Sequence, residues 1–417
     1  MTDVSKRAIQ TPMPRVLIVG AGPAGAGLAY LLAQRGVEVQ LLERQLDFAR
    51  EFRGEFLMPS GVEALEQMGL GSLLKSIPHM QPDSLEIYVH RRLALSLRTD
   101  DGDIRELFGE HRPQAVSQPA LLEAIAAEAA RAPGFELLRG ATVRDLLRER
   151  DRVVGARVHT AEGTRELRAD LVVGADGRAS VVRRRGGFEV REQAPPMDVV
   201  WFKVPTYAGY RGARGYLGRG HLLLSYEAWD DRIQVAWAIL KGSFGELRRR
   251  GVPEWIEEMA QHVTPDLASH LRAHRDALVH PFLLDAVSDR VTRWSAPGVL
   301  LLGDAAHTMS PVGGQGLNVA LRDAIVASNH LVPALRGGAA PEALDLAARA
   351  IEAERLPEIA AIQRAQAIPP RLILSRAWWA EPLRRVIGGA LRAGLGRFAL
   401  SRAGLFLFGA SPVRLRV

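Results

Sequence analysis

Hydrophobic residues near the start of the chain fall into short blocks that are separated by glycines and polar residues. The block Arg15–Val19 is apolar and rich in β-branched residues, which is typical of a buried parallel strand. Apolar residues recur at helical spacing over Gly25–Arg35, and Val37–Leu42 predicts a second strand. The pattern therefore predicts a strand–helix–strand unit of a parallel sheet.

Further along the chain, the pattern changes to alternation of apolar and polar residues. Ser84–Leu97 and much of the stretch 199–241 alternate in this way, which predicts antiparallel strands with one solvated face. The other predicted strands are Phe135–Leu138, Val153–His159, Asp170–Gly174 and Val299–Leu302, and the other predicted helices are Gln118–Arg131, Pro253–Arg272 and Leu317 to about Gln366.

A glycine-rich loop lies between the first strand and the first helix, with the sequence Gly20-Ala21-Gly22-Pro23-Ala24-Gly25. In such a loop the first glycine permits a tight turn, the second lets a pyrophosphate approach the backbone, and the third lets helix and strand pack closely. Glu43 ends the second strand, where a carboxylate can accept hydrogen bonds from ribose hydroxyls. We include the neighbouring Arg44 among the predicted cofactor contacts. The loop predicts a bound dinucleotide.

A segment far downstream indicates which dinucleotide binds. Asp304 follows the strand Val299–Leu302 and can hold a hydroxyl of a sugar-alcohol chain. The stretch from Pro311 to Asn318 can place backbone N–H groups beside the carbonyls of a redox ring, where they stabilise negative charge. These features predict a flavin. The predicted contacts here are Gly303, Asp304, Pro311, Gly314, Gly316, Leu317 and Asn318, whereas His307 is expected to be structural rather than a catalytic base.

Asp176 lies in a third motif, Gly174-Ala175-Asp176-Gly177-Arg178-Ala179-Ser180, which also follows a buried strand. Two interpretations stay open for this aspartate. It can close a turn and cap the following helix, or it can belong to the contact region for the flavin pyrophosphate and a reduced nicotinamide.

The three motifs together resemble the fingerprints of the class A flavoprotein monooxygenases, a family with the para-hydroxybenzoate hydroxylase fold that includes the ubiquinone-biosynthesis hydroxylases. They occur in the family's order between residues 15 and 325. The resemblance implies bound FAD, reduction by NADPH or NADH, and a flavin hydroperoxide that gives one oxygen atom to an aromatic or quinone-like substrate. It also implies flavin contacts at Arg53 and Gln118, and an adenine contact at Val143.

The expected architecture is an α/β fold: a Rossmann-like FAD-binding domain, an inserted antiparallel-sheet substrate domain and a C-terminal helical region. We assign 12–80, 113–187 and 286–335 to the FAD-binding domain. Residues 81–112 and 188–285 form the substrate domain, and 336–417 form the C-terminal region.

Composition removes several other classes of function. The chain of 417 residues has no cysteine, so disulfides, thiolate metal sites and cysteine nucleophiles are excluded, and no metal site is predicted. Arginine accounts for most of the net charge of +7, which fits a GC-rich genome better than nucleic-acid binding, and no nucleic-acid reader motif is present. The N-terminus lacks an apolar signal core, and no uncharged run reaches the about 18–20 residues that span a bilayer. A cytoplasmic enzyme is expected.

The substrate should lie between the antiparallel strands and the flavin. Alternation places His221, Leu223 and Ser225 on one face and Leu222, Leu224 and Tyr226 on the other, without showing which face looks toward the flavin. If the substrate needs a base, the candidates are His221, Tyr216 and Tyr226, although an electron-rich ring needs little help and there is then no base.

The segment 371–417 interleaves apolar residues with arginines and contains one acidic residue, Glu381. It is expected to be a helical layer on the FAD domain, a peripheral contact with a membrane or lipophilic substrate, or an oligomer interface. The chain is accordingly expected to be a monomer or a homodimer.

Other activities stay open for a flavin enzyme of this fold. They are epoxidation, Baeyer–Villiger-type oxygenation and reduction of prenyl chains, and a non-catalytic flavin-binding protein is a further alternative. A halogenase is disfavoured, because its Trp-x-Trp-x-Ile-Pro signature is missing.

Overall fold

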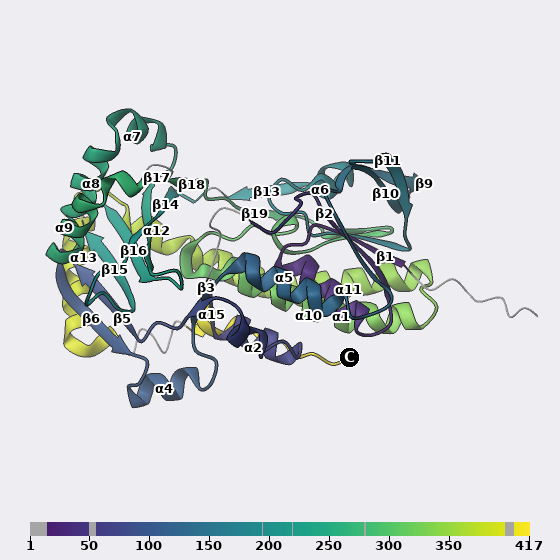
Figure 1. The fold of residues 1–417 in the computed structure, drawn as a ribbon, viewed down its shortest axis with the longest axis horizontal. Coiled ribbons are helices and arrows are strands. Elements are labelled where there is room, and N and C mark those ends of the chain that lie inside the picture. Colours follow the sequence, from purple (N-terminus) through teal and green to yellow (C-terminus); the bar gives the residue numbers. More distant parts are fainter. Residues whose placement is uncertain (1–14, 50–55, 194, 219, 279–280, 397–403) are drawn as a thin grey trace, which may run out of the picture.

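A computed structural model describes residues 15–49, 56–193, 195–218, 220–278, 281–396 and 404–417 (Figure 1). A six-stranded sheet with the order β20-β21-β12-β1-β2-β8 forms one half of the molecule. Every neighbouring pair in it is parallel except the edge strand β20. Its strands are β1 (Arg15–Val19), β2 (Glu38–Glu43), β8 (Phe135–Arg139), β12 (Leu171–Gly174), β20 (Ser295–Ala296) and β21 (Val299–Leu301).

The register of this sheet brings the three sequence motifs to one edge. Val19 pairs with Leu42 on one side and with Gly174 on the other, and Gly174 in turn pairs with Leu301. The residues that follow these strand ends are the glycine loop, the Asp176 turn and the Asp304 turn. Because the carboxyl ends of parallel strands form the binding edge of such a sheet, this edge is where a nucleotide is expected.

Helices cover the sheet, and their close packing depends on small residues. α1 (Pro23–Ala33) contacts α5 (Gln118–Ala129) and α10 (Gln315–Arg336), and α10 also contacts α2 (Pro59–Gln67) and α11 (Pro341–Gln366). At Gly27 on α1, a Cβ atom would lie 3.2 Å from the Cβ of Ala324. Elsewhere the chain adds the antiparallel meander β9 (Thr142–Glu149), β10 (Arg152–Thr160) and β11 (Gly163–Arg168), and the short helix α6 (Val181–Arg185).

A seven-stranded sheet forms the other half of the molecule, with the order β18-β14-β17-β16-β15-β5-β6 (Figure 1). All of its pairs are antiparallel except β15 with β5. Helices α7 (Phe244–Arg250), α8 (Val252–Ala260) and α9 (Pro265–Ala273) lie at this end, where α8 and α9 share a core with the sheet. The strands are β5 (Ser84–Val89), β6 (Arg92–Arg98), β14 (Met197–Pro205), β15 (Ala213–Gly218), β16 (His221–Glu227), β17 (Arg232–Leu240) and β18 (Phe282–Leu284).

Short strands connect the two halves. β13 (Val190–Gln193) pairs with β19 (Ser288–Val291), and a small sheet is formed by β3 (Phe56–Leu57), β7 (Gln114–Val116) and β4 (His79–Met80). Two further short α-helices in the described residues are α3 (Leu73–Ser76) and α4 (Gly102–Phe108). The predicted α/β fold with a second, largely antiparallel sheet is confirmed.

The C-terminal region is helical, as predicted, but it covers both halves rather than the parallel-sheet half alone. α12 (Ile368–Ile373) leads to α13 (Ala380–Ala390), which contacts β5 and β15 of the antiparallel sheet. After a π-helical turn (Leu391–Leu395) and α15 (Gly404–Phe408), the final residues run back along α2, where Arg414 forms an ion pair with Glu63 at 2.9 Å. Within the described residues, no helix is both long and apolar enough to cross a membrane.

Candidate active site

A single cavity of about 790 Å³ extends from the carboxyl ends of the parallel strands to the antiparallel sheet. Most of the residues predicted to contact the cofactor line it. They are Gly20, Gly22, Pro23, Ala24, Glu43, Arg44, Gln118, Val143, Asp176, Gly303, Asp304, Pro311, Gly314, Gly316 and Leu317. Gly25 and Asn318 are not on the wall, and Arg53 lies outside the described residues.

Each of the three glycines in the first loop is required for a different structural reason. Gly20 has φ +98°, and a Cβ there would come within 2.5 Å of the carbonyl oxygen of Ala175. A Cβ on Gly25 would lie 1.9 Å from the carbonyl oxygen of Gly20. At Gly22, by contrast, a Cβ would meet nothing within 4 Å and would point into open space. The loop thus leaves room for a pyrophosphate at the N-terminus of α1, where unpaired N–H groups favour an anion.

Glu43 holds the glycine loop as well as facing the cavity. Its side chain is 2% exposed, and its carboxylate accepts hydrogen bonds from the backbone N–H groups of Ala21 and Gln45, each at 3.1 Å. Glu43 also lies on the cavity wall, and a carboxylate can accept several hydrogen bonds, which suits ribose hydroxyls.

Asp304 projects from a turn in which Gly303 packs closely against Ala24. Gly303 has φ +57°, and a Cβ at this position would approach the Cβ of Ala24 to 3.0 Å. The Asp304 carboxylate lines the cavity and lies 3.4 Å from Nε of Arg178. This acceptor on the wall fits the polyol chain of a flavin.

The loop from Pro311 to Gly316 depends on two consecutive glycines with positive φ, Gly313 at +74° and Gly314 at +61°. Asn318 secures this loop instead of lining the cavity. Its Oδ1 accepts from the Met58 N–H at 2.8 Å, and its Nδ2 donates to the Gly314 carbonyl at 2.8 Å. The Asn318 side chain therefore positions the loop, and the contact of residue 318 with the cofactor stays a prediction.

The Asp176 carboxylate caps helix α6. It accepts hydrogen bonds from the Ser180 hydroxyl and from the backbone N–H groups of Val181 at 2.6 Å and Val182 at 3.2 Å. Asp176 also lines the cavity, so the two interpretations of this residue are compatible.

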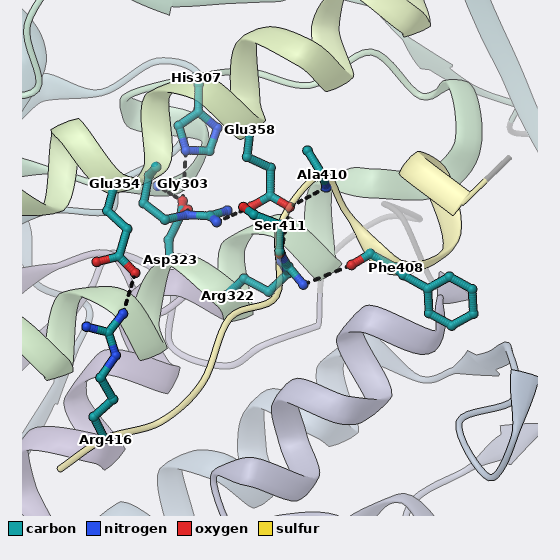
Figure 2. A network of polar contacts seen from close by, with 11 residues as sticks. Gly303, His307, Arg322, Asp323, Glu354, Glu358, Phe408, Ala410, Ser411 and Arg416 are labelled. Carbon is teal, nitrogen blue, oxygen red and sulfur yellow. Dashed lines mark hydrogen bonds and ion pairs between the residues drawn. The ribbon is translucent and has the colours of Figure 1, made fainter. Parts of the chain in front are cut away.

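A network of buried charges lies behind the Asp304 turn (Figure 2). Asp323 is fully buried and accepts from the Gly303 N–H at 3.2 Å, from His307 Nε2 at 2.8 Å and from Arg355 Nε at 2.8 Å. Burial alone would raise the pKa of Asp323, but the charges of His307 and Arg355 lower it below its ordinary value. His307 is absent from the cavity wall, and its contacts are those of a structural residue.

The network continues away from the cavity. Arg355 also pairs with Glu358, which accepts from Arg322 Nη2 at 2.6 Å. The contributions of Asp323, Arg322, Arg355 and Glu358 to the site were not predicted from the sequence. The available signal was the charged pair Arg322–Asp323 within an otherwise apolar helical stretch, because charges are seldom buried unless they are paired.

The antiparallel sheet turns the face of Leu222, Leu224 and Tyr226 toward the cavity. The neighbouring wall is also largely apolar. It includes Met197, Val199, Trp201, Ala236, Ala238 and Leu284.

The opposite face of the sheet carries two of the three candidate bases, which argues against both in this cavity. His221 stacks on His262 with ring centroids 3.9 Å apart, and burial together with Arg376 and Arg384 lowers its pKa to about 4. The Tyr216 hydroxyl lies 3.2 Å from the Thr264 hydroxyl, and burial raises the pKa of Tyr216. Only Tyr226 reaches the wall.

Fold and site together define an FAD-dependent monooxygenase. Residues 13–365 match the FAD binding domain family, and the chain belongs to this family. It is 32% identical over 369 residues to the 6-methylpretetramide 4-monooxygenase of Streptomyces rimosus, which covers 86% of this chain and 84% of the relative. It is 30% identical to the ubiquinone hydroxylase UbiL of Rhodospirillum rubrum, over 82% of this chain and 78% of that protein.

Solved structures agree with this assignment. PqsL of Pseudomonas aeruginosa in complex with 2-aminobenzoylacetate has a TM-score of 0.74 at 26% identity, covering 88% of this chain and 98% of the other. HpxO of Klebsiella pneumoniae, complexed with FAD and uric acid, has a TM-score of 0.76 at 19% identity, covering 96% and 98%, and shows the same fold. The chain is therefore an enzyme that binds FAD, and the alternative of a non-catalytic flavin-binding protein is wrong.

Proposed function

We propose that this enzyme uses NADPH or NADH and O2 to hydroxylate an aromatic or quinone-like small molecule. The observation that carries the proposal is the continuity of one cavity from the glycine loop to the apolar face of the antiparallel sheet. FAD, when bound, supplies the redox chemistry between the reduced nicotinamide and O2. The glycine loop and Glu43 would hold its adenosine and pyrophosphate, and Asp304 with the Pro311–Gly316 loop would hold its polyol chain and ring.

The substrate end of the cavity suits a flat, apolar molecule. The small side chains of Ala236 and Ala238 leave space above the sheet, and the larger apolar side chains of Trp201, Leu222 and Leu224 line the cavity beside them. Such walls exclude water from the reacting ring, which protects the oxidant from side reactions. A relative that is 31% identical, the 3-amino-4-hydroxybenzoate 2-monooxygenase of Streptomyces cremeus, is named for an aromatic ring and supports this class of substrate.

Of the three candidate bases, Tyr226 is the one on the cavity wall, where it would orient a substrate hydroxyl. Its ring packs edge-on against Phe56, with centroids 4.9 Å apart, and its residue lines the cavity. A hydroxylated ring is already electron-rich, so a positioning contact is sufficient and no strong base is required.

The test is the oxidation of NADPH or NADH by the FAD-loaded enzyme in the presence of candidate phenols and quinones. A substrate should accelerate both nicotinamide oxidation and O2 uptake, and a hydroxylated product should accumulate. Reduction of a double bond without O2 would instead indicate a reductase, and oxygen insertion into an alkene or next to a ketone would indicate epoxidation or Baeyer–Villiger chemistry.

We also infer a peripheral contact between the enzyme and anionic lipid surfaces. In the described part of the chain, Trp378 is 87% exposed, and other exposed apolar side chains lie nearby in sequence. Exposed arginines lie between these apolar residues. We define the basic apolar surface as the exposed arginine and large apolar side chains between residues 371 and 395, which are Arg371, Arg376, Trp378, Trp379, Arg385, Val386, Ile387, Arg392 and Leu395. The acidic residue Glu381 is engaged by His90 and Arg384, so the arginines dominate.

Two physical points favour a lipid surface over a second copy of the chain. A symmetric dimer through the basic apolar surface would bring like-charged arginines together, whereas Trp and Arg side chains suit an anionic interface. In addition, α12 exposes Ile368 and lines the cavity with Pro369, Pro370 and Ile373, which connects this region to the substrate site.

Co-sedimentation with lipid vesicles tests the contact. The enzyme should bind vesicles that contain an anionic phospholipid and not neutral vesicles. Trp378→Ser with Trp379→Ser should abolish binding, while Leu346→Ser, at an exposed leucine on α11, should not. Absence of binding, or a dimer that these tryptophan substitutions dissociate, would overturn the inference.

A further inference from the structure

A segment near the C-terminus, residues 404–411, contacts both loops of the cofactor site. We call Gly404–Ser411 the C-terminal clasp; it comprises α15 and the three residues after it. Figure 2 shows that Phe408, Ala410 and Ser411 meet the buried charge network beside α10. The clasp itself is distant in sequence from every cofactor motif.

The first connection runs through buried charges. The Ala410 N–H donates to Oε1 of Glu358 at 3.0 Å, and Arg322 Nη1 donates to the Phe408 carbonyl at 3.1 Å. Glu358 pairs with Arg355, Arg355 pairs with Asp323, and Asp323 accepts the Gly303 N–H. A continuous series of contacts therefore joins the clasp to the turn that presents Asp304.

The second connection is direct and reaches the ring-binding loop. Gln315 Nε2 donates to the Phe406 carbonyl at 2.6 Å, and the Phe406 ring lies against Gly313, where a Cβ would come within 2.9 Å of it. Leu407 lines the cavity itself.

The buried charges in the network are paired with one another. Asp323, Arg355, Glu358 and Arg322 are each at most 3% exposed, and the two carboxylates are paired with the two arginines, while His307 also contacts Asp323. Removing the partner of a buried charge is strongly unfavourable. If the clasp leaves, Arg322 loses carbonyl acceptors and Glu358 loses a donor, so the network that fixes Gly303 must rearrange.

We propose that the C-terminal clasp is a positioning element for the flavin, whose docking and FAD binding stabilise each other. Such a coupling is reciprocal: a released clasp weakens FAD binding, and bound FAD holds the clasp in place. This inference depends on FAD binding and not on which substrate is hydroxylated.

A pair of glycines in the clasp provides a matched test. Gly409 has φ +84°, and a Cβ there would lie 2.2 Å from Oε1 of Glu358 and 2.8 Å from Nη2 of Arg322. A Cβ on Gly404 would meet nothing within 4 Å. Gly409→Ala should therefore displace the clasp, while Gly404→Ala should leave it docked, and neither residue lines the cavity.

The measurement is titration of each folded apoprotein with FAD, at a temperature well below its unfolding transition. Gly409→Ala should weaken FAD binding about 10-fold or more, within the usual range of coupling between two sites, and should alter the absorption spectrum of the bound flavin. Gly404→Ala should bind as the parent does. Equal FAD affinity for the folded Gly409→Ala variant and the parent would overturn the proposal.

Hydrogen exchange on the unmodified enzyme gives an independent outcome that needs no variant to fold. Bound FAD should slow amide exchange across 404–411 relative to the apoprotein. Exchange in the exposed turn at Ala161 and Glu162, which is remote from the clasp in sequence, should not change. Identical exchange of the clasp with and without FAD would contradict the coupling.

Discussion

At the scale of single residues, the cofactor site combines groups that face the ligand with groups that hold the backbone. Gly22 faces open space and Asp304 lies on the cavity wall, so both face the ligand. Gly25 packs against the Gly20 carbonyl, and the Asn318 side chain bonds two backbone segments, so both hold the backbone. Substitutions should separate these two kinds.

Gly22→Ala should therefore lower FAD affinity, whereas Gly25→Ala should lower the stability of the apoprotein. The alanine methyl at position 22 points into open space, so the apoprotein should unfold at nearly the parental temperature while its FAD affinity falls. The methyl at position 25 would collide with the Gly20 carbonyl at 1.9 Å, so the apoprotein should lose about 1–3 kcal/mol of stability, as overpacked sites do. Thermal unfolding of the apoproteins and FAD titration measure the two effects. An apoprotein with Gly22→Ala that is the less stable of the two would contradict this account.

Asp304→Ala should weaken FAD binding about 10- to 100-fold, the loss of one hydrogen bond to a charged group, without changing the fold. Circular dichroism and flavin titration measure these quantities. Asp276→Ala, at an exposed aspartate, is the control and should bind FAD normally. Unchanged flavin affinity in Asp304→Ala would remove this carboxylate from the cofactor site.

At the scale of elements, the two faces of β16 contact different parts of the molecule. One face lines the cavity with Leu222, Leu224 and Tyr226, and the other packs under α8 and α9. Sequence alternation predicted the two groups of side chains correctly. It could not show which group faces the flavin, because both faces are substantially apolar and both are covered.

The pKa of His221 makes the packing of β16 on α8 sensitive to pH. Burial and the positive charges of Arg376 and Arg384 lower the pKa of His221 from 6.5 to about 4. They do so although the Glu258 carboxylate lies 3.7 Å from His221 Nε2. Between these values the unfolded chain binds a proton that the folded protein does not, so stability falls as pH decreases from about 6.5 to 4. We expect this one residue to account for about 2 kcal/mol after allowance for solvent screening.

Denaturant unfolding at several pH values, compared between the parent and His221→Gln, isolates this contribution. The variant should lose less stability than the parent on acidification, because its side chain does not titrate. His159→Gln, at an exposed strand position, should follow the parent. Identical acid dependence of the parent and His221→Gln would show that His221 titrates normally.

At the scale of the whole molecule, the cofactor motifs of the parallel-sheet half could be predicted from the sequence. The buried charge network and the clasp behind them could not. The glycine loop and the Asp304 turn are local signals, because tight turns and close backbone approach require glycine at fixed positions. The pairs Asp323–Arg355 and Ala410–Glu358 join residues that are 32 and 52 positions apart. Only the packing of α10, α11 and the clasp brings them together, and no local pattern encodes that packing. Strands β9 and β11 also escaped prediction, because they carry many charges.

Isotope labelling of O2 tests whether the enzyme transfers an oxygen atom to its substrate. The FAD-loaded enzyme is supplied with NADPH or NADH, a phenolic or quinone-like substrate, and O2 enriched in oxygen-18, and the product is analysed by mass spectrometry. We expect a product that contains one atom of oxygen-18 and that forms only while the nicotinamide is oxidised. A product whose new oxygen comes from water, or turnover without O2 uptake, would contradict it.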